Sequence, residues 1–154
     1  MDESTSTLIK LTSNIYRCTQ CYLDKELCKF KLTTGTYPYL FVLNRCPGIS
    51  QNDISKELSV DKAMSARTVK KLIELEYVKK EENEEDIRAY KLYITDKGRS
   101  LLPEIRKIVQ EWINILIKGN NEEEVKTSIK FLEDVLRKAK ECKVASCGRR
   151  NKFE

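Results

Sequence analysis

The sequence predicts a mainly α-helical fold with one small antiparallel β-hairpin. Apolar residues recur at spacings of three and four along most of the chain, which is the helical period, and strict alternation occurs only near residues 88–94. The composition agrees, because the 154 residues are 34% charged and include only 5 Gly and 3 Pro. Collagen-like and low-complexity classes are thereby excluded, and the length fits about one domain.

The N-terminal region, residues 1–34, is predicted to be an amphipathic helix from Ser4 to about Leu32. Its apolar face carries Leu8, Leu11, Ile15, Cys18 and Tyr22. The LTTGT segment at 32–36 interrupts this helix. A short, nearly all-apolar helix follows over residues 37–46, and Pro47-Gly48 ends it.

Residues 50–75 are predicted to form two short helices joined by a tight turn. Ser50 lies three residues before Asp53, which is close to a capping box, and Ser59 or Asp61 caps the second helix. The expected buried stripe of that second helix is Ala66, Val69, Leu72 and Ile73. This arrangement is a candidate helix-turn-helix.

Two predicted strands, residues 77–80 and 88–94, come directly after the second helix. In the later strand Tyr90, Leu92 and Ile94 alternate with Lys91 and Tyr93. A polar tip, residues 81–87, joins the strands. A hairpin in this position is a wing, so residues 35–97 are predicted to form a winged helix-turn-helix domain.

The C-terminal region, residues 98–140, is predicted to hold two amphipathic helices. Thr95 or Asp96 caps the first, which ends before Gly119, and Pro103 predicts a bend or a delayed start. Asn121 with Glu124 caps the second. Both helices carry apolar residues at alternating spacings of four and three. Residues 141–154 are expected to be a disordered basic tail.

The apolar rows of the two C-terminal helices and the apolar face of the N-terminal helix favour a homodimer over a monomeric helical bundle, because rows with this spacing commonly pack between chains. The expected dimerisation residues are Leu8, Leu11, Ile15, Ile108, Trp112, Ile115, Ile129, Leu132 and Leu136.

Charge and composition exclude some classes of function and leave others open. The net charge is +5, but residues 137–152 carry seven basic residues against one acidic residue, so the remainder is slightly acidic. The chain has no histidine, which excludes histidine-based catalysis, and no nucleophile–base or phosphate-loop motif suggests an enzyme. The polar start and the absence of long apolar runs favour a cytoplasmic protein without membrane contact.

The order of elements, together with D61-K-A-M-S-A-R-T-V-K-K-L-I-E-L-E-Y-V78 and D86-I-R-A-Y-K-L-Y-I-T-D-K-G98, resembles the MarR (multiple-antibiotic-resistance regulator) family of winged-helix transcription regulators. The resemblance covers about residues 8–140. It implies an obligate homodimer that binds pseudo-palindromic double-stranded DNA and releases it on binding a ligand or on oxidation.

Three positions depart from the family pattern. Glu76 stands where a left-handed Gly is usual, at a cost of about 1 kcal/mol for a non-glycine residue. Ala63 replaces a Ser or Thr near the start of the second short helix. The wing tip, residues 81–86, carries five carboxylates, which phosphates would repel.

The candidate DNA-binding residues are Ser50, Gln51, Lys62, Ser65, Arg67, Lys70, Lys71 and Arg88. Arg67 could contact guanine in the major groove, the lysines could neutralise phosphates, and Arg88 could enter the minor groove, braced by Asp86. A solvated helix face and a plain Ser50 cap are the alternative interpretations.

Cys18, Cys21, Cys28 and Cys46 are best explained as reduced core residues, with a redox sensor or a metal site as alternatives. Cys142 and Cys147 lie in the tail. The resemblance also suggests an effector pocket for a small aromatic or phenolic compound, lined by Tyr16, Tyr22, Tyr37, Tyr39, Phe41 and Trp112, although such aromatics are often core residues.

The sequence therefore predicts a dimeric, sequence-specific DNA-binding repressor without a cofactor, released by a small-molecule effector. Two alternatives stay open. One is a winged-helix protein-interaction module, and the other is a thiol-based redox or metal-responsive regulator.

Overall fold

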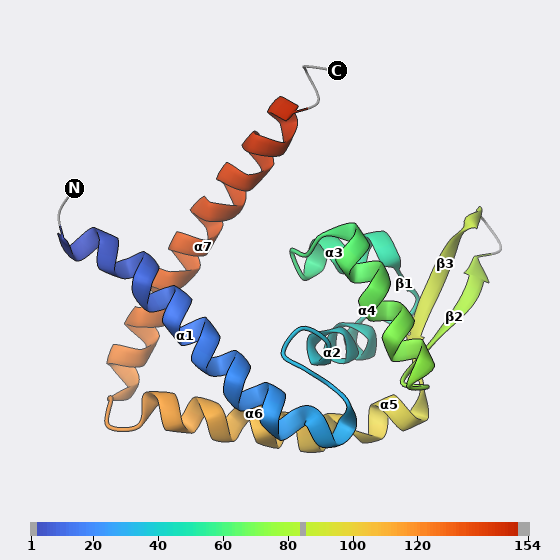
Figure 1. Cartoon of the computed structure of the whole chain (residues 1–154), viewed down its shortest axis with the longest axis horizontal. Helices are drawn as coiled ribbons and strands as arrows, with labels where there is room; N and C mark the ends of the chain where they lie inside the picture. The colour runs from blue at the N-terminus through green and yellow to red at the C-terminus, as the bar shows by residue number, and fades with distance from the viewer. Residues whose placement is uncertain (1–2, 84–85, 151–154) are drawn as a thin grey trace. The chain divides into compact units, whose positions relative to one another are not determined.

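The computed structural model describes the backbone of residues 3–83 and 86–150, and within these ranges the side chains of residues 7–82 and 90–142. The described elements, in chain order, are α1 (Glu3–Leu27), the 3-10 helix η1 (Cys28–Phe30), α2 (Tyr37–Arg45), β1 (Ile49–Ser50), α3 (Gln51–Glu57), α4 (Lys62–Glu74), β2 (Val78–Asn83), β3 (Asp86–Ile94), α5 (Asp96–Ser100), α6 (Leu102–Ile117) and α7 (Glu122–Arg150). The predicted fold class, a mainly helical protein with a winged helix-turn-helix, is confirmed (Figure 1).

The sheet has three antiparallel strands in the order β1-β3-β2. β2 and β3 form the predicted hairpin, with Val78 opposite Ile94 and Lys80 opposite Leu92. The strand β1 was not predicted from the sequence; it has two residues, and its Ile49 pairs with Leu92. So short a strand has no alternation to detect, and its pairing fixes the chain just before α3 on the edge of the wing.

Two helix boundaries differ from the expected ones. The helix expected over about 97–117 is interrupted at Leu101, and α6 begins at Leu102 with Pro103 in its first turn, which confirms the delayed start. α7 continues to Arg150, whereas the helix was expected to end near Lys140. Loss of the apolar period does not by itself stop a helix, and residues 141–150 include no proline to break it.

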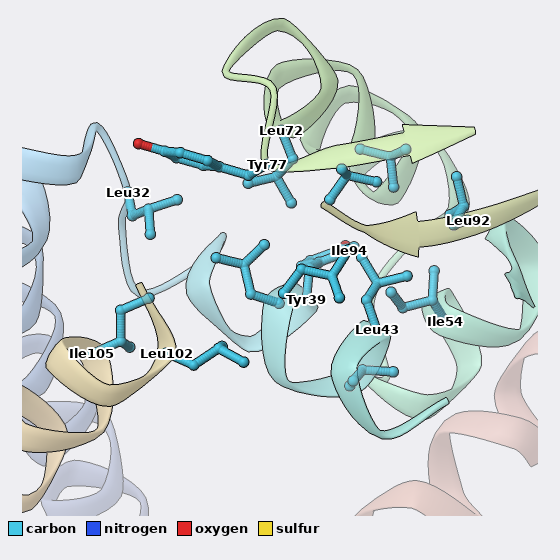
Figure 2. Packing of buried hydrophobic residues seen from close by; sticks show 14 of the residues in the cluster. Leu32, Tyr39, Leu43, Ile54, Leu72, Tyr77, Leu92, Ile94, Leu102 and Ile105 are labelled. Atoms are coloured by element: carbon cyan, nitrogen blue, oxygen red, sulfur yellow. The ribbon is translucent and has the colours of Figure 1, made fainter. Parts of the chain in front are cut away.

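The chain divides into two compact units, residues 1–113 and 114–154. In the first unit a single hydrophobic core joins α2, α3, α4 and the hairpin with Leu23 and Leu27 of α1 and with Ile105 of α6. Figure 2 shows labelled side chains of α2, α3, α4, the hairpin and α6 converging, together with Leu32. This differs from the expected divisions at 34–35 and 97–98, because α1 and α6 supply core residues to the winged domain.

In the described residues, the second unit consists of α7 and the last residues of α6, 114–117. The start of α7 is fixed by a reciprocal cap: Glu124 N donates to Asn121 Oδ1 at 2.9 Å, and Asn121 N donates to Glu124 Oε2 at 3.0 Å. This is the capping box predicted from the sequence. Within the part of the chain that the structure describes, no helix is both long and apolar enough to cross a membrane.

Candidate nucleic-acid interface

The helix-turn-helix is formed by α3 and α4, and side-chain caps fix the first turn of each helix. Asp53 N donates to Ser50 Oγ at 3.1 Å, and the Ser50 hydroxyl donates to Asp53 Oδ2 at 2.7 Å. Asp61 Oδ1 accepts from the backbone N–H groups of Ala63 and Met64 at 2.8 and 3.2 Å. These bonds satisfy helix N–H groups that would otherwise lack a partner.

The cap of α3 also changes the pKa of Asp53. The hydrogen bond from Ser50, followed by the interaction with Lys56, lowers the pKa of Asp53. Gln51 is the first residue of α3 and is exposed, whereas Ser50 is half-buried. An ionised Asp53 at the N-terminus of this short helix interacts favourably with the helix dipole. The Ser50 side chain is used for capping, and its backbone belongs to β1.

The face of α4 opposite the core is basic. Lys62, Arg67, Lys70 and Lys71 are all exposed, as predicted. Lys70 lies 3.9 Å from Glu74, in a pair whose members are both largely solvated. Among the described residues no carboxylate pairs with Lys62, Arg67 or Lys71, so these three charges are available to an anionic partner.

Ser65 was predicted to be exposed on the same face, and that prediction was wrong. The residue is 0% exposed, and its hydroxyl has no hydrogen-bond partner among the described residues. It shares the core-facing side of α4 with Val69 and Leu72, four and seven residues later. That helical spacing was present in the sequence and could have revealed the burial.

The wing is the hairpin of β2 and β3, whose far end extends beyond the core. Arg88 and Asp86 belong to β3, but their side chains lie outside the described residues, so the predicted minor-groove contact and its brace have no side-chain geometry here. Lys79 pairs with Glu81 at 2.7 Å, and this hydrogen bond raises the pKa of Lys79. Glu82 is exposed, so the described part of the tip keeps the acidic character expected from the sequence.

The junction after α4 confirms the expected left-handed residue. Glu76 has φ 62°, in the region that favours glycine. Lys97 Nζ lies 2.7 Å from Glu76 Oε2, and this hydrogen bond lowers the pKa of Glu76. Thr95 Oγ1 donates to the Glu76 carbonyl at 2.7 Å, which ties the chain just after α4 to the start of α5.

Four of the six candidate pocket aromatics form two ring pairs. Tyr22 stacks on Trp112 with ring centroids 4.6 Å apart, and the Trp112 indole donates to Thr19 Oγ1 at 3.0 Å. Tyr37 and Phe41 meet edge to face at 6.0 Å, and burial raises the pKa of Tyr37.

The other two aromatics differ in burial, and the core cluster that contains Tyr39 is the one against which both pairs pack. Tyr39 is 1% exposed in the core, and Tyr16 is exposed on α1. Tyr39 is therefore a core residue, which was the alternative interpretation of the aromatic set.

The interpretation of the cysteines as core residues was wrong for Cys18, Cys21 and Cys28, which are exposed; Cys46 is half-buried. At 100° per residue, Cys18 and Cys21 lie on the side of α1 opposite Leu23, which is buried. In the described part of the chain, no group of three or more Cys, Asp or Glu residues is placed to hold a metal ion. Cys147 lies outside the described side chains.

The predicted dimerisation residues fall into three groups. Ile108 is 4% exposed in the chain's own core, so its assignment to a subunit interface was wrong. Leu8 is half-buried, and Trp112 is half-buried against Tyr22. The exposed apolar members are Leu11, Ile15, Ile115, Ile129, Leu132 and Leu136, and Ile9 and Phe131, which were not predicted, are exposed as well.

Comparison with known proteins identifies the family. The family model described as MarR family matches residues 30–89. The HTH-type transcriptional regulator BilQ of Clostridioides difficile is 38% identical over 129 residues, covering 84% of this chain and 87% of that protein. The chain belongs to the MarR family. Its members are transcriptional regulators and not enzymes, so the expected absence of catalysis agrees with the family.

Solved structures support the same conclusion. A MarR transcriptional regulator from Methanosarcina mazei superposes with a TM-score of 0.82 at 31% identity, covering 89% of this chain and 99% of that one. MepR of S. aureus, solved as a DNA complex, shares the fold with a TM-score of 0.80 at 21% identity, covering 90% of this chain and 98% of that one. The MarR fold thus extends over most of this chain.

Proposed function

We propose that this MarR-family chain is a homodimeric repressor that binds a pseudo-palindromic operator in double-stranded DNA and is released by a small effector. The observation that carries the DNA-binding proposal is the exposed, basic face of α4, presented by a capped helix between a tight turn and a wing. In helix-turn-helix proteins the second helix enters the major groove with its N-terminal residues against the base edges. MepR, which shares this fold, was solved as a DNA complex, and this supports DNA as the partner of this chain.

Each basic residue takes a role that matches its chemistry. Arg67, at the centre of the exposed face, contacts guanine O6 and N7 in the major groove. Lys62, Lys70 and Lys71 neutralise phosphates. Gln51, with the backbone N–H groups after Ser50, lies at a helix N-terminus suited to a phosphate; Arg88 is assigned to the minor groove with Asp86 as its brace. Ser65 is left out, because its hydroxyl is buried.

Substitution of Arg67 by Ala tests the proposal. The bidentate base contact is worth about 1–3 kcal/mol, so its loss should weaken each half-site by roughly 5- to 150-fold, and the losses of the two half-sites of the dimer multiply. Arg106→Ala removes the same side chain from an exposed position on α6 and serves as the matched control. Fluorescence anisotropy with a selected duplex measures both. Equal affinities of the two variants would rule out the role of Arg67.

The homodimer is supported by exposed apolar side chains that a soluble monomer rarely leaves in water. Within the second unit, Ile129, Leu132 and Leu136 follow one face of α7, and each is at least 45% exposed. A second copy of the chain offers the same seam, which is the arrangement of a symmetric coiled-coil contact. Leu132→Glu should give a monomer in sedimentation, and Glu133→Lys on the same helix should not.

The effector proposal is supported by the half-buried pairs Tyr22–Trp112 and Tyr37–Phe41. Planar aromatic compounds stack on such rings, so a small phenol or benzoate is the proposed class. Thermal unfolding with phenol, benzoate and 4-hydroxybenzoate tests this class. Stabilisation by at least one of them, lost in Trp112→Leu, is expected; the absence of stabilisation by all three would contradict it.

Two alternatives are each favoured by one observation. Exposed Glu81 and Glu82 in the wing favour a protein-interaction module; DNA affinity that does not fall with salt would support it, since neutralised phosphates require a steep fall. Exposed Cys18, Cys21 and Cys28 favour a thiol-responsive regulator. Mass spectrometry after peroxide treatment would detect that chemistry. Because we propose that the protein acts on DNA, we also propose that it works in the cytoplasm.

A further inference from the structure

Met64 is an apolar side chain on the basic face of α4 and has no role in the function proposed above. Its side chain is 50% exposed, and it does not belong to the hydrophobic core cluster of the described residues. Its backbone N–H donates to the Asp61 cap, which places it in the first turn of α4. The fold therefore leaves Met64 uncovered at the end of the helix that approaches bases.

Helical geometry groups Met64 with the cations of the same face. At 100° per residue, Met64 lies about 60° around the helix from Arg67 and about 20° from Lys71. Ala63, the preceding residue, is exposed and small. A partner that covers this face therefore meets cations and one apolar side chain, and a partner with both negative charge and an apolar group fits it best.

Duplex DNA offers one apolar group of this kind in the major groove, the C5-methyl group of thymine. A methionine has no strong donor or acceptor, and its thioether chain is flexible and adapts its shape to an apolar neighbour. We infer that Met64 packs against a thymine C5-methyl group in each half-site and thereby contributes to sequence specificity. This inference rests on the proposed DNA-binding function and adds a specificity-determining residue to it.

Deoxyuridine provides a direct test, because it lacks only the C5-methyl group of thymidine. After a bound duplex is selected from a random pool, each symmetric pair of thymidines is replaced by deoxyuridine in turn. Burial of one methyl group corresponds to about a fourfold change in affinity. Wild-type protein should therefore lose about 16-fold at one symmetric pair, since the dimer contacts two half-sites, and little at the other pairs.

Variants at position 64 connect that loss to Met64. Met64→Ala should bind the thymidine and deoxyuridine duplexes equally at the sensitive pair, and Met64→Leu should keep the difference. Lys62→Ala is the control, because loss of a phosphate contact weakens binding to both duplexes alike. Met64→Ala should also unfold at the wild-type temperature, since the side chain is not part of the core.

The outcomes separate this inference from the proposed function. Arg67-dependent binding with no sensitive thymidine, or a sensitive pair that Met64→Ala leaves unchanged, would overturn the role of Met64 alone. A protein that binds no duplex at low salt would overturn the proposed function and this inference together. Loss of binding to every sequence in Met64→Ala, without a change in the thymidine–deoxyuridine ratio, would also contradict the inference.

Discussion

Gly98 lies in the first turn of α5, which packs against the end of the wing, and its replacement by Ala should destabilise the first unit. A Cβ atom on Gly98 would lie 2.4 Å from the Tyr77 carbonyl oxygen and 3.0 Å from Ile94 Cγ1, and real Cβ atoms essentially never approach backbone as closely as the first of these. The neighbouring backbone must therefore move. The same junction holds the bond from Thr95 N to Tyr77 O at 3.0 Å and the cap from Gly98 N to Thr95 Oγ1 at 3.0 Å.

The size of the effect follows from these contacts. Overpacking in a close-packed site costs about 2 kcal/mol, and loss of the Thr95 cap costs about 1 kcal/mol. The higher helix propensity of Ala returns about 1 kcal/mol. The net loss in the free energy of unfolding is therefore about 2 kcal/mol, or a fall of roughly 4–8 °C in Tm for a chain of this size.

Urea and thermal unfolding followed by circular dichroism measure this loss. Gly35→Ala is the matched control, because the nearest atom to its added Cβ would be Thr33 Oγ1 at an ordinary 3.9 Å. The control should unfold within about 0.5 kcal/mol of the wild type, as surface substitutions usually do. If Gly98→Ala were as stable as Gly35→Ala, the close approach at Tyr77 would not control this junction.

Three further predictions concern single side chains. Ser65→Ala should raise the free energy of unfolding by about 1 kcal/mol, because it removes a buried hydroxyl without a partner; DNA affinity should not change, and a specific loss would restore Ser65 to the interface. Glu76→Gly should raise Tm, because it relieves a left-handed backbone at φ 62°; a lower Tm would mean that the contact with Lys97 outweighs the strain. The pKa of Asp53 is lowered in the folded state, so its contribution to stability is present above the unfolded pKa near 4 and is lost as pH falls through the folded pKa. The stability difference between wild type and Asp53→Asn should therefore shrink between pH 6 and pH 3, and a constant difference in urea unfolding would contradict this.

Local chemistry made much of the fold predictable. The caps at Ser50, Asp61 and Thr95 and the capping box at Asn121 all form in the structure. Each depends on residues within three positions of one another, so its signal is complete in the sequence. The left-handed position at Glu76 was predicted through the family resemblance, from the place where a glycine is usual.

The errors concern contacts between distant segments. Cys18 and Cys21 lie near the apolar residues of α1, but the core lies on the side defined by Leu23 and Leu27. Ile108 fits a seam of alternating spacing, yet its side chain is buried in the first unit. Periodicity shows that a helix has an apolar side and does not show which neighbour covers it.

The sequence alone determined the order of the helices and the hairpin, the caps that start the helices, and the cationic character of α4. These properties follow from residues close together in the chain, where propensity, capping and period act. Only the tertiary structure decided that Ile108 is buried in the first unit, that Met64 faces outward, and that β1 joins the sheet through Leu92. Those outcomes depend on how segments far apart in the chain share one core, and burial is set by all the surrounding elements together.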